Sequence, residues 1–172
     1  DGPQTLFLVG LPGSGMDLLE SVLLPHPDIC TLGESPNLIQ TRQALQHLIC
    51  KTTPQSQDWD WCSDTTPKLA RAARHAYFNL LPADKIGNAG IAIDKLPQNL
   101  FEMGFARMIL PEARFVFLMH HPLDLGLTLF ASHFHSGHSY SHQLDWIGQM
   151  IRTSYAALDD YIPKLDTRLR LQ

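Results

Sequence analysis

A short apolar run followed at once by a glycine-rich turn is the feature that most constrains how this chain can fold. Residues 6–9 read Leu-Phe-Leu-Val, and residues 10–15 read Gly-Leu-Pro-Gly-Ser-Gly. Apolar side chains then recur at helical spacing until Pro25 ends the pattern. A strand, a glycine loop and a helix in this order predict the first unit of a parallel sheet. The backbone amides of such a loop, together with the start of the helix after it, favour a bound anion.

Two later apolar runs predict further strands of the same sheet. Residues 90–93 read Gly-Ile-Ala-Ile and precede Asp94 and Lys95, and residues 114–119 are apolar on both faces, as in a central strand covered by helices. Strands that alternate with helices predict an α/β fold, in which a parallel β-sheet is flanked by helices on both faces. Helices are expected at residues 36–48, 67–81, 97–110, 122–134 and 143–161.

The length of the chain indicates its domain organisation, and its charge and hydropathy exclude some classes of function. A chain of 172 residues has the size of one ordinary domain, so we expect a single domain over residues 1–172, with a polar loop insertion at 51–66. The 13 basic and 17 acidic residues give a net charge of −4 without runs of like charge, which argues against a nucleic-acid binder. The longest apolar run, residues 115–119, is far shorter than the roughly 20 residues that span a membrane, and we see no secretory signal.

Cysteine usage favours a reducing compartment. Cys30, Cys50 and Cys62 are odd in number, lie 20 and 12 residues apart, and include no Cys-x-x-Cys pair. This pattern argues against a disulfide framework and against a structural zinc site. We therefore expect free thiols and a cytoplasmic location.

The glycine loop is half of a nucleotide-binding motif. The spacing Gly10-x-x-x-x-Gly15 directly after a strand matches the first part of the Walker A pattern, but Met16 and Asp17 stand where that pattern requires Lys and Ser or Thr. Hydrolysis of ATP or GTP depends on that lysine and that hydroxyl, so a nucleoside triphosphatase is not expected. On the glycines alone, an ordinary tight turn between strand and helix is an equal alternative.

Seven short blocks along the chain have a shared order and spacing. They are Val-Gly-Leu-Pro-Gly-Ser-Gly at 9–15, His-Pro at 26–27, Gly-Glu at 33–34, Asp-Lys-Leu-Pro at 94–97, Leu-Pro-Glu-Ala-Arg-Phe at 110–115, Pro-Leu-Asp at 122–124 and Gly-His-Ser-Tyr at 137–140, continuing to Leu144. Together they resemble the sulfotransferase family, in particular the branch of bacterial sulfotransferases linked to tetratricopeptide repeats and of protein-tyrosine sulfotransferases. The resemblance covers most of the chain and implies a P-loop-like parallel sheet wrapped by helices.

The resemblance also implies a reaction and a binding site. Members of the family transfer a sulfuryl group from 3′-phosphoadenosine 5′-phosphosulfate to a hydroxyl or amine, and they require no metal. The 5′-phosphosulfate is expected over Pro12, Ser14 and Gly15. Thr128 lies eight residues after His120, which is the spacing of the family's Arg and Ser pair that binds the 3′-phosphate.

Two residues are implied to act in the chemistry, and each has a simpler interpretation. Glu34 aligns with the general base of the tyrosine-sulfating relatives, and Lys95 aligns with a lysine that contacts the transferring group. Alternatively, Glu34 is a first-turn acidic residue favoured by a helix dipole, and Lys95 is a solvent-facing lysine paired with Asp94. Thr128 is equally explained as an ordinary residue in the interior of a helix.

The chain departs from the family pattern at several positions that would donate hydrogen bonds or positive charge to the phosphosulfate and the 3′-phosphate. Gly13 replaces a basic residue of the loop, Met16 and Asp17 replace a Thr-Thr pair, and His120 replaces an arginine. A carboxylate beside a bound phosphosulfate would repel it unless it points away or caps the helix. The alternative function is therefore a non-catalytic nucleotide- or anion-binding pseudoenzyme that serves as an interaction domain beside tetratricopeptide helices.

The resemblance further implies that part of the domain is missing. Family members continue past the helix expected at residues 143–161, and residues 167–171 are expected to begin the next strand. The acceptor, a small molecule or a protein with a hydroxyl or amine, is not indicated by any residue pattern.

Histidines are concentrated in one part of the chain. Six of the nine lie between residues 120 and 142, so a histidine-dependent metal site is a third alternative. No carboxylate or cysteine pattern of a known zinc motif accompanies them, and histidines at a helix end are favoured by the helix dipole. We therefore expect no metal.

Overall fold

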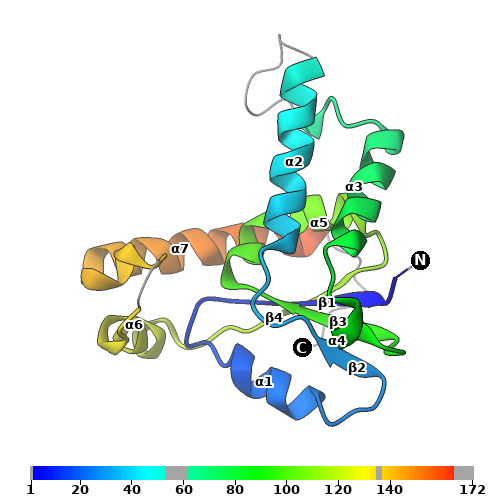
Figure 1. The fold of residues 1–172 in the computed structure, drawn as a ribbon. Coiled ribbons are helices and arrows are strands. Elements are labelled where there is room, and N and C mark those ends of the chain that lie inside the picture. Colours follow the sequence, from blue (N-terminus) through cyan, green and yellow to red (C-terminus); the bar gives the residue numbers. More distant parts are fainter. Residues whose placement is uncertain (1, 53–61, 135–136, 165–172) are drawn as a thin grey trace.

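Four parallel strands form the central sheet of the structure, a computed structural model that describes residues 2–52, 62–134 and 137–164 (Figure 1). β1 (Gln4–Val9) lies between β3 (Ile91–Lys95) and β4 (Arg114–Phe117), and β2 (Ile29–Thr31) pairs with the other side of β3. The strand order is thus β2-β3-β1-β4. Because the carboxyl ends of parallel strands share one edge, the segments that follow the strands meet there.

Helices cover both faces of this sheet. Figure 1 shows α1 on one face and α2, α3 and α5 on the other, and α6 packs against α7. The predicted α/β fold, a parallel sheet flanked by helices on both faces, is confirmed. In the part of the chain that the structure describes, no helix has the length and apolar character needed to cross a membrane. The helices are α1 (Met16–Leu23), α2 (Asn37–Thr52), α3 (Pro67–Asn79), α4 (Ala83–Ile86), α5 (Met103–Ile109), α6 (Pro122–Ala131) and α7 (Leu144–Tyr161), with 3-10 turns η2 (Pro97–Glu102), η3 (Ser139–His142) and η4 (Ile162–Lys164).

The sequence reading missed one strand and misplaced some boundaries. β2 has three half-buried residues and pairs with β3 alone, so it carries no long apolar run by which it could be recognised. The strand expected at 114–119 ends at Phe117, and the helix expected at 97–110 begins as the 3-10 turn η2. Lys51, expected in a loop insertion, lies in α2. Residues 53–61 of that expected insertion, and residues 167–171, lie outside the described residues.

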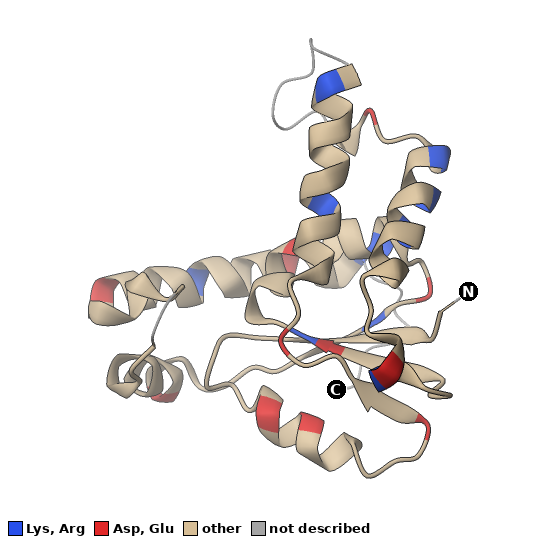
Figure 2. Cartoon of the chain, in the orientation of Figure 1, with Lys and Arg blue, Asp and Glu red and all other residues tan. Residues whose placement is uncertain are grey.

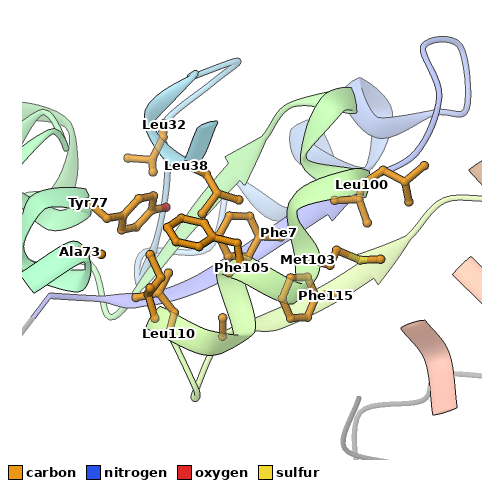
Figure 3. Close-up of a cluster of buried hydrophobic side chains, with 14 of the residues drawn as sticks. Phe7, Leu32, Leu38, Ala73, Tyr77, Leu100, Met103, Phe105, Leu110 and Phe115 are labelled. Carbon is orange, nitrogen blue, oxygen red and sulfur yellow. The ribbon is translucent and has the colours of Figure 1, made fainter. Parts of the chain in front are cut away.

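The main core lies between the sheet and the helices α2, α3 and α5 (Figure 3). Phe7 on β1 and Phe115 on β4 are register partners, and their rings stack with centroids 5.3 Å apart. Tyr77 of α3, Leu38 of α2 and Leu110 after α5 close over them and are buried. Apolar burial of this kind is the dominant favourable term in folding, so this layer holds the sheet from the side opposite α1.

One carboxyl group is buried within this core. Asp94 is register partner to Phe7 and is fully buried. Tyr77 Oη donates a hydrogen bond to Asp94 Oδ2 at 2.8 Å, and Asn99 Nδ2 donates to Asp94 Oδ1 at 2.8 Å. Burial raises the pKa of Asp94 from 3.8 to about 6, against the opposing effect of these two hydrogen bonds. The network ties the end of β3 to α3 and to η2.

The substitution Asp94→Asn should change how stability depends on pH. The unfolded chain ionises this carboxyl near pKa 3.8 and the folded chain near 6, so its contribution to folding falls as the pH rises through that range. A pKa difference of this size corresponds to about 3 kcal/mol. We expect the free energy of unfolding of D94N, relative to the unsubstituted chain, to rise by up to about 3 kcal/mol between about pH 4 and pH 7.

Urea unfolding of both chains at several pH values measures this difference. Asn99, whose Nδ2 lies 2.8 Å from Asp94 Oδ1, also carries an Oδ1 that accepts no hydrogen bond from the described residues and is available as an acceptor for the new amide. Asp145→Asn, at an exposed first-turn position of α7, serves as the control and should show no such trend. The prediction would be contradicted if the difference in unfolding free energy between D94N and the unsubstituted chain stayed constant across the pH range.

Candidate functional site

Most of the residues singled out in the sequence lie at the carboxyl edge of the sheet. Residues 10–15 follow β1, residues 32–36 follow β2, Lys95 ends β3, and His120 follows β4. Ligands of open α/β sheets bind at this edge, where the loops are free to diverge and helix amino termini converge. The four segments therefore form the candidate site.

The loop at residues 10–15 has the backbone expected of an anion-binding turn. Gly13 and Gly15 have φ values of +82° and +97°, a region that side chains disfavour, and Gly15 is the N-cap of α1 without a side-chain cap. The first backbone hydrogen bond into α1 is donated by Leu19 to Gly15 O at 3.0 Å. No described residue accepts from the amides of Met16 and Asp17. These amides and the helix dipole are available to an anion.

Ser14 adds a hydroxyl donor inside the loop. Its side chain is buried, and its Oγ has no hydrogen-bond partner among the described residues. The hydroxyl lies over Gly10, where a Cβ atom would be 2.6 Å from Ser14 Oγ and 2.8 Å from Leu118 O. Buried polar groups are usually paired, so an unpaired hydroxyl in an anion loop is suited to a ligand. Pro12 is half-buried and Gly15 exposed on the same loop.

Helix α6 closes the loop on its other side. A Cβ atom at Gly13 would lie 2.8 Å from Thr128 Cγ2 and 3.8 Å from Leu125 Cδ1. Thr128 therefore lies directly against the glycine loop, although it is exposed over the rest of its surface. The glycine at position 13, where the family pattern has a basic residue, therefore suits the local backbone and packing. The positive φ would strain a residue with a side chain there, and its Cβ would approach the Thr128 methyl group too closely unless Thr128 moved.

Lys95 points from the end of β3 toward α1. Its side chain is only 8% exposed, and its Nζ pairs with Asp17 Oδ1 and, at 2.7 Å, with Glu20 Oε2. Asp94, the preceding residue, faces the opposite side of the sheet, where Tyr77 binds it. The alternative of a solvent-facing lysine paired with Asp94 is therefore wrong. The structure brings a buried cation against the helix that begins at the glycine loop.

The two acidic partners of Lys95 occupy different environments. Figure 2 shows α1 with acidic residues as its only charged positions. The Glu20 side chain is 13% exposed and accepts a hydrogen bond from Thr31 Oγ1 on β2, whereas the Asp17 side chain is 90% exposed. Burial alone would lower the pKa of Lys95, but hydrogen bonds and charges from Asp17 and Glu20 outweigh it and raise this pKa above 10.5. Lys95 is thus a fully charged cation at neutral pH.

Glu34 lies on the strand-end segment next to Lys95. The amide of Lys95 donates to Gly33 O at 3.3 Å, so the segment that carries Glu34 runs beside the end of β3. Gly33 has a φ of +68°, which turns the chain sharply before Glu34. The Glu34 side chain is exposed. The structure thus places Glu34 at the same edge as Lys95, open to an approaching molecule.

At the level of sequence, Asp17 was treated as a carboxylate that repels a bound phosphosulfate unless it points away or caps the helix, and Glu20 was not considered. A helical spacing of three residues places both on one side of α1, which is a signal that was available in the sequence. That their common partner is Lys95, 75 residues beyond Glu20, depends on the pairing of β1 with β3. His120 is exposed, and its carbonyl accepts a hydrogen bond from Tyr155 Oη at 2.6 Å.

Two hollows of the described residues lie apart from this edge. A cavity of about 410 Å³ is lined by Phe101, Tyr140 and Trp146 among others, and one of about 630 Å³ by residues of α3 and the segment after α5. Neither is lined by the glycine loop or by Lys95. No three His, Cys, Asp or Glu side chains within the described ranges are arranged to hold a metal ion.

Comparison with known proteins finds similarity along almost the whole chain. Residues 3–169 match the family model described as the sulfotransferase family. The sulfotransferase domain of the olefin synthase from Synechococcus PCC 7002 is similar in structure, with a TM-score of 0.56 and 16% sequence identity over 100% of this chain and 66% of that one. At this identity the structural similarity shows the fold.

A curated relative is much longer than this chain. An uncharacterized protein of Aquifex aeolicus (strain VF5) is 22% identical over 162 residues, which are 92% of this chain and 21% of that protein. The chain therefore spans about a fifth of that relative. With the family model matched over residues 3–169 and the same fold in a solved sulfotransferase domain, the chain belongs to the sulfotransferase family.

Proposed function

We propose that this domain binds 3′-phosphoadenosine 5′-phosphosulfate and transfers its sulfuryl group to a hydroxyl or amine. The observation that carries the proposal is the position of Lys95, a buried cation that reaches α1 from the end of β3. It lies beside a loop whose following amides, those of Met16 and Asp17, have no acceptor among the described residues. A sulfuryl donor requires such a combination of amide donors and positive charge. Membership of the family supports the choice of donor.

The proposed reaction is an in-line displacement at sulfur. The acceptor oxygen or nitrogen forms a bond to sulfur while the bond from sulfur to the bridging phosphate oxygen breaks, and 3′-phosphoadenosine 5′-phosphate leaves. Glu34 takes the proton of the acceptor, since its exposed carboxylate lies at the edge where the acceptor must arrive. Lys95 stabilises the negative charge that develops on the bridging oxygen. The chain's contribution is therefore alignment, proton removal and charge stabilisation.

The same geometry supports the proposed binding residues. Pro12, Ser14 and Gly15 line the 5′-phosphosulfate, and the buried Ser14 hydroxyl supplies a donor that has no other partner among the described residues. Thr128 lies against Gly13 and is proposed to contact the 3′-phosphate. The acceptor is a small molecule or a protein, and tetratricopeptide helices are proposed neighbours. The three free thiols support a cytoplasmic location.

A second function is favoured by the charge balance of the site. Asp17, Glu20 and Lys95 together carry a formal charge of −1, so the cation is already neutralised by residues of the chain. A polyanionic sulfuryl donor would therefore meet less positive charge at the site than an unpaired Lys95 would offer. The second candidate is therefore a non-catalytic nucleotide- or anion-binding domain with an interaction role.

Replacing Lys95 should abolish most ligand affinity. K95M keeps the aliphatic stem and removes the charge, and we expect at least about tenfold weaker binding of 3′-phosphoadenosine 5′-phosphate in calorimetric titration. K164A removes an exposed lysine paired with Asp160 at 2.7 Å and should leave the affinity unchanged. Thermal unfolding of both variants separates lost binding from lost folding. Equal affinity of folded K95M and the unsubstituted chain would remove Lys95 from the site.

Replacing Glu34 separates the two candidate functions. E34Q removes the base without removing a hydrogen-bonding group, so an enzyme should lose about 10²–10⁴-fold in turnover while its nucleotide affinity stays within about twofold. Transfer of labelled sulfate from the donor to 4-nitrophenol and to a tyrosine-containing peptide measures turnover. If the unsubstituted chain binds the nucleotide and transfers to neither acceptor, the non-catalytic function is favoured. Turnover that E34Q leaves unchanged would exclude Glu34 as the base.

A further inference from the structure

We propose that Asp17 competes with the anionic ligand of the loop for Lys95, so that this carboxylate lowers the affinity of the site. Glu20 remains paired with the lysine and holds it in position. The inference deepens the proposed function and rests on it for one point, that the ligand of residues 10–15 is an anion. It makes Asp17 a residue that sets affinity.

The first observation is the unequal exposure of the two carboxylates. Asp17 is 90% exposed at its side chain, and Glu20 is 13% exposed. An exposed carboxylate that leaves an ion pair is hydrated at once, so its release costs little. A carboxylate that is mostly buried would lose its partner without gaining water. Of the two, Asp17 is the partner that can exchange.

The second observation is that Glu20 has a second anchor. Its Oε2 accepts from Lys95 Nζ at 2.7 Å, while its Oε1 accepts from Thr31 Oγ1 on β2. Thr31 Oγ1 in turn accepts from the amide of Gly33 at 3.0 Å. Glu20 thus links α1 to β2 and β3 at once. Movement of Asp17 leaves this link, and with it the position of the ammonium, in place.

The third observation is where Asp17 sits on its helix. It is the second residue of α1, within the first turn, where the helix dipole and amides without an acceptor in the described part of the chain attract an anion. Its carboxylate reaches Lys95 from that same end. An anion bound to the loop and in contact with Lys95 would therefore lie beside the Asp17 carboxylate. Asp17 and Glu20 already share this ammonium, and the bound anion would be a third negative group beside it, so repulsion favours release of the exposed Asp17 carboxylate.

The competition predicts a gain of affinity when Asp17 loses its charge. D17N should bind 3′-phosphoadenosine 5′-phosphate about 5- to 20-fold more tightly than the unsubstituted chain, since the ammonium is released from one counter-ion. The control is D84N, which removes an exposed first-turn carboxylate from α4, the helix that precedes β3. D84N should bind within about twofold of the unsubstituted chain, because exposed charges at a distance are screened.

Calorimetric titration of the three chains at one salt concentration makes the comparison. D17N in the K95M background tests the mechanism, because a competition for Lys95 predicts that the gain disappears there. The proposal is overturned if the unsubstituted chain binds the nucleotide and D17N binds it equally or more weakly. It is also overturned if the gain persists without Lys95. In either case the proposed function stands.

A measurement without nucleotide keeps the two proposals distinguishable. Calorimetric titration with inorganic pyrophosphate in place of the nucleotide measures the affinity of the loop for a smaller anion. If no chain binds the nucleotide, yet D17N binds pyrophosphate about fivefold or more tightly than the unsubstituted chain, the competition holds and the proposed donor is wrong. Equal affinity of both chains for pyrophosphate, or binding by neither, overturns the competition.

Discussion

Burial of the Lys95 ammonium is the constraint on which the arrangement of the site depends. An ammonium that leaves water needs charged or hydrogen-bonding partners, and here α1 supplies two carboxylates. Because α1 begins directly after residues 10–15, the same contacts fix the glycine loop relative to the end of β3. Helix α1 thus has two opposing roles. Its first amides can bind an anion, and its carboxylates partly neutralise Lys95.

The end of β3 is held from both faces of the sheet. Asp94 and Lys95 are consecutive residues of a strand, so their side chains point in opposite directions. Asp94 is bound by Tyr77 and Asn99 in the main core, and Lys95 is bound by carboxylates of α1. Lys95 is therefore held from several sides and has little freedom to move. The side chains of the candidate site that are free to change conformation are instead the exposed ones of Asp17 and Glu34.

Sequence patterns predicted the elements with strong apolar runs, and these lie where they were expected. The strand at 6–9, the strand at 90–93 and the helix at 143–161 correspond to β1, β3 and α7. β2 was missed because its three half-buried residues are held by the ladder to β3 rather than by a pattern of their own. The contact between Gly13 and Thr128 was not predictable in detail, because it depends on how α6 packs against the loop.

The sequence by itself determined that a strand and a glycine loop precede a helix, and that a parallel sheet follows, because periodicity and glycine placement are local properties. It also determined the family, through the order and spacing of short blocks. Only the tertiary structure decided which charges meet. Residue 95 lies 78 and 75 positions from residues 17 and 20, and their contact follows from the parallel pairing of β1 with β3 and from the burial that forces Lys95 to find partners.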